Sequence, residues 1–120
     1  MTTATGHTTA ILASTVIGTE VKNINGDGLG EIEDIVLDKL SNSIKFVIVS
    51  FGGFLGMGEK YHPLPWSVLK YSAEEDAYLI NIDKEKLKAA PADSIEALTR
   101  NDGDDYRERV YSYYDTPRHW

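Results

Sequence analysis

The sequence predicts a mainly β protein whose strands form a small, strongly bent antiparallel barrel, with a short helical or extended tail at the C-terminal end. Residues 46–49 are the longest run of large β-branched and aromatic side chains, which is typical of a central strand covered on both faces. Glycine-rich turns at 25–30 and 52–58 flank the strands around it. Together these patterns place the central strand at 43–51.

The first predicted strand, 20–24, alternates polar and apolar residues, and the NGDGLG turn at 25–30 reverses the chain. We expect Gly28 and Gly30 to have positive φ angles or to lie against another backbone. The returning strand, 31–38, carries its apolar residues on both parities, so it requires a bulge or bend near Asp34.

The second half of the domain is predicted from its prolines. Residues 60–68 contain two prolines and can form only an edge or bent strand, with Trp66 closing one end of the barrel. The last strand is expected at 77–82. Asp83 can then cap a short helix that Pro91 ends.

The chain is divided by composition into a disordered leader (1–10), one barrel domain (11–91), and a linker with an aromatic tail (92–120). In the tail we expect a helix near 105–114. Val110 and Tyr114 share a face that would lie on the barrel, with Glu108 toward water.

Charge and composition exclude several classes of function. A net charge of −7 opposes binding to nucleic acid or to anionic lipid, and the absence of cysteine excludes disulfides and thiolate sites. No apolar run approaches the roughly 18 residues that span a bilayer, and the N-terminus is unlike a secretory signal. We therefore expect a cytoplasmic protein without membrane insertion.

A calcium loop is the strongest metal candidate. Asn23, Asn25, Asp27 and Asp34 occupy positions 1, 3, 5 and 12 of such a loop, although its flanks read as strands and an EF-hand needs helices. A hairpin turn is the favoured interpretation, so no metal site is predicted. The three histidines, His7, His62 and His119, are too scattered for a metal site.

No catalytic residues and no cofactor are predicted. Ser67, His62 and Asp76 could form a triad in principle, but the G-x-S-x-G elbow is missing, and we expect these residues to be structural. The glycines of 53–58 do not match a dinucleotide or phosphate loop.

Protein contacts are predicted at two places. In the glycine loop, Phe54, Leu55 and Met57 could either plug a barrel end or form a contact patch, because aromatic and Met side chains suit a protein partner. The tail holds five further candidates, which are Val110, Tyr111, Tyr113, Tyr114 and Trp120. If the tail reaches a second subunit, it would stabilise an oligomer.

A resemblance supports this fold. The pattern comprises Gly18, Val21, Asn23, Gly28, Gly30, Ile32, Asp34, Asp38, Pro65, Trp66 and Leu69. Across about 11–91 it resembles the PRC-barrel family, which includes the cytoplasmic domain of the photosynthetic reaction centre H subunit and the C-terminal domain of the ribosome maturation factor RimM. The glycine loop and the Tyr-rich, Trp-bearing tail are most similar to the small stand-alone bacterial members.

The resemblance implies a bent barrel that binds other proteins and is not an enzyme. We therefore expect a non-enzymatic adaptor module that binds protein partners and self-associates into a dimer or a larger homo-oligomer. The alternative is a small-ligand or calcium-binding protein that uses the turn from Asn25 to Gly30.

Overall fold

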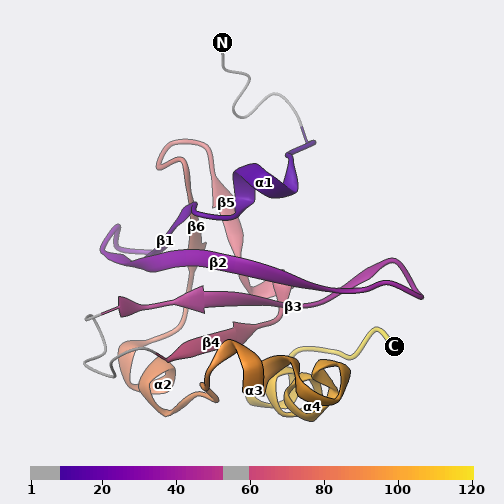
Figure 1. The fold of residues 1–120 in the computed structure, drawn as a ribbon. Coiled ribbons are helices and arrows are strands. Elements are labelled where there is room, and N and C mark those ends of the chain that lie inside the picture. The colour runs from indigo at the N-terminus through magenta and orange to yellow at the C-terminus, as the bar shows by residue number, and fades with distance from the viewer. Residues whose placement is uncertain (1–8, 53–59) are drawn as a thin grey trace.

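The computed structural model describes residues 9–52 and 60–120 and shows a six-stranded mixed sheet in the order β4-β3-β2-β1-β6-β5. Helices α2, α3 and α4 lie along the β4 side of this sheet (Figure 1). The strands are β1 (Glu20–Asn23), β2 (Gly28–Asp38), β3 (Ser43–Ser50), β4 (Tyr61–Leu64), β5 (Lys70–Ser72) and β6 (Ala77–Ile80). The helices are α1 (Ala13–Val16), α2 (Lys84–Ala89), α3 (Ile95–Thr99) and α4 (Asp104–Tyr113), with 3-10 turns η2 (Trp66–Val68) and η3 (Arg100–Gly103).

The hairpin between β1 and β2 is held by one asparagine side chain. Asn23 Oδ1 accepts hydrogen bonds from the backbone N–H groups of Asn25, at 2.9 Å, and Asp27, at 3.0 Å. The positive φ of this turn, 90°, is at Gly26, so Gly28 and Gly30 do not have the first of the two features expected of them. Gly30 instead has the expected close backbone approach, because a Cβ built on it would lie 1.9 Å from the carbonyl oxygen of Ser50.

Strand β2 bends where the sequence requires it. Its pairing with β3 shifts register between Ile32 and Asp34, which confirms the predicted bulge, and shifts again between Val36 and Leu37. The first shift lets Ile32 lie in the core although the later apolar residues of β2 are on the opposite parity.

The predicted closed antiparallel barrel was wrong, because the sheet is mixed and open. Strands β1 and β6 pair in parallel, with Val21 opposite Tyr78, and the two edges, β4 and β5, do not pair with each other. Pro63 removes one donor from β4. The outer edge of β4 is instead paired at Tyr61 with Asp93, through N–H to O distances of 2.9 and 3.0 Å.

Trp66 accordingly closes no barrel. It begins the 3-10 turn between β4 and β5, and its half-buried ring lies 5.3 Å from the ring of Tyr78 at the margin of the core.

The predicted helix cap at Asp83 is confirmed, and Ser94 caps α3 in the same way. Asp83 Oδ1 accepts from the N–H of Lys86 at 2.8 Å, and Ser94 Oγ accepts from the N–H of Ala97 at 3.1 Å. Each cap satisfies a backbone donor that the first turn leaves without a partner. The caps fix where α2 and α3 begin and thereby how the chain returns to β4.

The helix predicted at 105–114 is observed as α4, and it completes the main core. Val110, Tyr111 and Tyr114 pack in one cluster with residues of all four central strands, while Glu108 is exposed as expected. A second, smaller cluster joins Phe46 and Ile48 to Leu98 of α3 on the other face of β3. Leu98, Val110, Tyr111 and Tyr114 are therefore part of the fold's own core.

Candidate functional site

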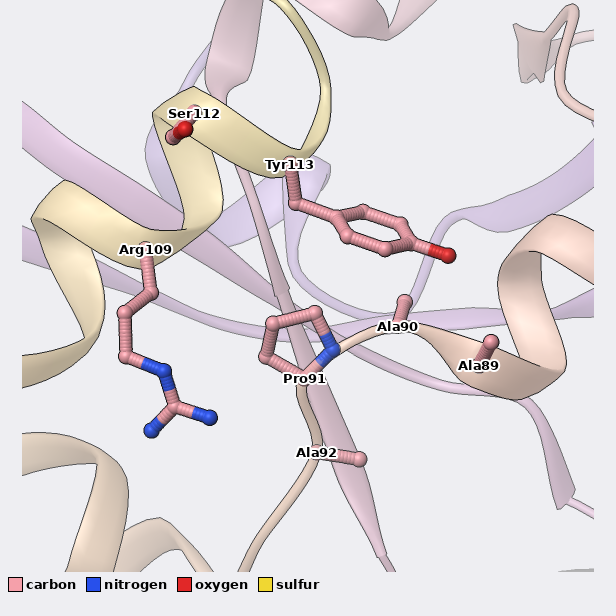
Figure 2. A pocket seen from close by; sticks show the side chains of 7 residues that line it. All are labelled: Ala89, Ala90, Pro91, Ala92, Arg109, Ser112 and Tyr113. Atoms are coloured by element: carbon pink, nitrogen blue, oxygen red, sulfur yellow. The ribbon is translucent and has the colours of Figure 1, made fainter.

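An open groove of about 580 Å³ lies between α4 and the extended segment that follows α2 (Figure 2). Seven residues line it: Ala89, Ala90, Pro91, Ala92, Arg109, Ser112 and Tyr113. We refer to it as the α4 groove. It brings a charged side chain, Arg109, together with a floor of small side chains.

The floor of the α4 groove is backbone with small side chains. The chain leaves α2 at Ala90 in an extended conformation, with φ of −70° and ψ of 156°, and Pro91 prevents the helix from continuing. Two residues later Asp93 is hydrogen-bonded to Tyr61 at the edge of β4. Because both ends of this segment are held and its side chains are short, the space above it stays open.

The wall consists of Arg109 and Tyr113, which lie one helical turn apart on α4. In Figure 2 the ring of Tyr113 lies over Ala90, and Arg109 extends toward the other end of the same segment. The Tyr113 hydroxyl donates to the carbonyl oxygen of Lys86, which joins α4 to α2. The Lys86 ammonium lies 5.4 Å from the centre of the Tyr113 ring.

Arg109 is the charged side chain that lines the α4 groove, and the nearby Asp93 is hydrogen-bonded to Tyr106. The Tyr106 hydroxyl donates to Asp93 Oδ2 at 2.7 Å, and this hydrogen bond is the main reason why the pKa of Asp93 is lowered and that of Tyr106 is raised. The Arg109 guanidinium lies 4.8 Å from the Tyr106 ring centre and forms no ion pair within the described residues. The groove therefore presents an exposed cation on a chain of net charge −7.

The predicted calcium residues build a turn. Besides the two bonds at Asn23 Oδ1, its Nδ2 donates to Asp27 Oδ2 at 3.2 Å. Asp34 lies on β2 and accepts the N–H of Ile35 at 2.7 Å. Within residues 9–52 and 60–120, no cluster of three His, Asp or Glu side chains could hold a metal ion.

A smaller cavity, of about 290 Å³, adjoins this turn. Its floor is apolar, with Leu29, Ile80 and Leu87, and Asn25 and Asn81 add carboxamide groups. A cavity of this kind can hold a small molecule that has an apolar body and a polar edge.

The three residues considered for a triad lie in separate environments. His62 is 1% exposed in β4 and packs edge-on to the ring of Phe51 at 4.9 Å. Burial, with a smaller contribution from the charge of Lys60, lowers the pKa of His62 to about 4. Asp76 accepts the Tyr71 hydroxyl at 2.7 Å in the turn between β5 and β6. Ser67 lies in η2 beside a further apolar cavity of about 570 Å³.

The predicted partner-binding residues fall into three groups. Phe54, Leu55 and Met57 lie outside the described residues. Val110, Tyr111 and Tyr114 are 0%, 3% and 7% exposed, so they pack in the chain's own core and offer no surface.

The other two tail residues are accessible. Tyr113 is half-buried and lines the α4 groove, and Trp120 is 41% exposed with its ring 3.9 Å from the guanidinium of Arg107.

Sequence reasoning missed Arg109, Ser112 and the floor at 89–92. Arg109 and Tyr113 have the i, i+4 spacing of one helix face, and Ala-Ala-Pro-Ala is the most prolonged run of small residues after the domain's last strand. Those patterns could have suggested a face and a shallow surface, but only the fold brings the two together.

The comparisons agree with this architecture. A family model described as PRC-barrel domain matches residues 8–87, which is two thirds of the chain and ends within α2. A comparison with curated proteins found no match. No helix of the described residues is long and apolar enough to cross a bilayer. The α4 groove lies at the junction between the matched region and the helices that follow it. Because the family model covers two thirds of the chain, the chain belongs to the PRC-barrel domain family.

Proposed function

We propose that this chain is a non-enzymatic, cytoplasmic adaptor that binds an extended segment of a partner protein in the α4 groove and that also self-associates. The observation that carries the proposal is the groove itself, an open surface groove with a floor of backbone and small side chains, one tyrosine ring on its wall and one exposed guanidinium.

The shape favours an extended peptide. The floor runs from Ala89, the last residue of α2, into chain that is extended from Ala90, and its side chains are short, so a second extended chain can lie close to it. Tyr113 offers a rigid apolar face of the kind enriched in protein interfaces. These features suit a flexible loop or terminus of a partner.

The charge favours an acidic peptide. Arg109 can form a bidentate ion pair with a carboxylate, and its guanidinium makes no such pair within the described chain. A partner carboxylate placed over Arg109 would leave its neighbouring side chains to pack on Pro91 and Tyr113.

Self-association has separate support. Leu40 is 90% exposed at the tip of the β2–β3 hairpin, and Leu37 is 65% exposed beside it. Large apolar side chains so fully exposed are a feature that an assembly would cover.

Capture of partners by immobilised protein tests the groove. We expect a partner that the native chain retains to be lost with Arg109→Glu and to be displaced by a free Glu-rich peptide. Lys70→Glu, which makes the same change of charge on exposed β5, is the matched control and should retain the partner. Equal retention by both variants would contradict the proposed groove.

The second candidate is a small-ligand protein that uses the cavity beside the Asn25 turn. Here we expect calorimetric heat on titration of a small ligand, with loss of the signal in Asn25→Ala. Titration with calcium alone tests whether the turn from Asn25 to Gly30 binds this ion. If either titration gives saturable heat while partner capture fails, this candidate replaces the first.

A further inference from the structure

The connection between α3 and α4 is a left-handed turn. Asn101 has φ of 55° and ψ of 45°, Asp102 has 60° and 19°, and Gly103 has 78° and 0°. Residues other than glycine visit this region singly, because the Cβ then approaches the next carbonyl oxygen. Two consecutive such residues before a glycine make this connection strained.

Contacts from the sheet and from α4 hold the turn in this shape. Lys45 Nζ donates to the carbonyl oxygen of Asp102 at 2.6 Å and to Asp104 Oδ1 at 3.2 Å. Asn101 Nδ2 donates to Asp105 Oδ1 at 3.0 Å. Gly103 faces Phe46 so closely that a Cβ would lie 3.2 Å from the ring.

The main contacts of α4 with the rest of the fold are made by residues that lie beyond the turn. Tyr111 donates to the carbonyl oxygen of Lys45 at 3.1 Å, and Tyr113 donates to that of Lys86. Val110 is fully buried in the main core. A second copy of the chain presents the same sheet and the same acceptors, so its surface can receive α4 equally well.

We propose that two copies of this chain form a dimer by exchanging α4, with residues 101–103 extended so that each α4 packs on the partner's sheet. This inference rests on the self-association in the proposed function and names its mode. The exchanged dimer keeps the contacts of Val110, Tyr111 and Tyr113, gives up those of Lys45 and Phe46 with residues 102–103, and releases the left-handed turn in both chains. Three extended residues span at most about 10 Å, so the two copies must lie close together.

Two substitutions at Asp102 move the equilibrium in opposite directions. Glycine tolerates the left-handed turn, so Asp102→Gly should favour the monomer, whereas valine prefers extended backbone, so Asp102→Val should favour the dimer. Since each dimer releases two turns, a tenfold effect per chain changes the dimer dissociation constant about a hundredfold. Light scattering after size exclusion over a concentration series measures this constant.

Asp76 provides the matched control, because it also has a positive φ, of 50°, but lies in the turn between β5 and β6. Asp76→Val should lower stability without changing the dissociation constant. Isotope-filtered NOEs in a mixed labelled and unlabelled dimer should connect the Tyr111 ring of one chain to Lys45 of the other.

Two results would overturn the exchange. If every Tyr111 to Lys45 contact in the dimer is within one chain, the chain self-associates without exchanging α4. If Asp102→Gly and Asp102→Val leave the dissociation constant unchanged, the turn does not control assembly, even should Asp102→Val prove hard to fold. Neither result bears on the α4 groove, whose test uses Arg109→Glu at a site outside the turn.

Discussion

Replacing Gly30 with alanine should be among the most damaging single changes that the sheet can undergo. The new Cβ would lie 1.9 Å from the carbonyl oxygen of Ser50 and 2.8 Å from Cα of Phe51. Both atoms are backbone, so no side-chain rotation relieves the clash and β2 must move away from the end of β3. We expect the free energy of unfolding to fall by about 3–5 kcal/mol, at the upper end of overpacking effects.

Substitutions at two other glycines of the same hairpin distinguish the cost of steric crowding from the cost of backbone strain. Gly26 has open space around it but a φ of 90°, so Gly26→Ala should cost about 1–2 kcal/mol. At Gly28 the nearest atom is Oε2 of Glu20, the movable end of an exposed side chain, and Gly28→Ala should cost about 0.5 kcal/mol or less. Urea denaturation of the three variants gives the order. If Gly30→Ala proves no worse than Gly26→Ala, the close approach of β2 to β3 is wrong.

Three further predictions concern the core and the tail. Because burial lowers the pKa of His62 from 6.5 to about 4, the unfolded chain binds a proton between these pH values that the folded chain does not. The free energy of unfolding should therefore fall by about 3 kcal/mol as the pH drops through this window, and His62→Phe should abolish that slope in denaturation series. Truncation after Arg100 removes Val110, Tyr111 and Tyr114 from the core, and it should lower the melting temperature strongly and leave the product monomeric; an unchanged melting temperature and gel-filtration size would contradict this. Trp120→Ala should cost about 1 kcal/mol through loss of its stacking on the Arg107 guanidinium, measured against Arg118→Ala, which removes the more distant cation beside the same ring.

Local features of the fold could be predicted because each depends on a few neighbouring residues. The parity change in β2 required the bulge near Asp34, and Pro63 required an edge strand. Asp83 and Ser94 are cap residues that stand directly before short helical patterns. In each case the backbone geometry of one residue type decides the structure.

The pairing of distant strands could not be predicted in the same way. Strands β1 and β6 are adjacent in the sheet but more than fifty residues apart in the sequence, and nothing in either strand specifies a parallel partner. Strand β5, with three residues, is too short to show a period. A closed barrel was expected from the bend in β2 and from the family resemblance, and nothing in the sequence indicates that Asp93, rather than another strand, pairs with Tyr61.

In the tail, one buried helix face could be predicted from the sequence, but the α4 groove could not. The i, i+4 spacing of Val110 and Tyr114 correctly predicted that these two side chains share one buried face. Tyr111, one residue further around the helix, is also buried because α4 lies against the sheet over a wide arc. The α4 groove depends on that placement together with the path of 89–92, and neither segment alone indicates a site.

Site-specific photo-cross-linking tests the central claim, that the α4 groove binds a partner protein. A benzophenone amino acid placed at Ser112, an exposed position on the groove wall, should form adducts with the captured partner. The same group at Lys70, on exposed β5, should form none, and a free Glu-rich peptide should suppress the adducts at position 112. Adducts that form from position 70 and not from position 112 would show that the partner binds elsewhere.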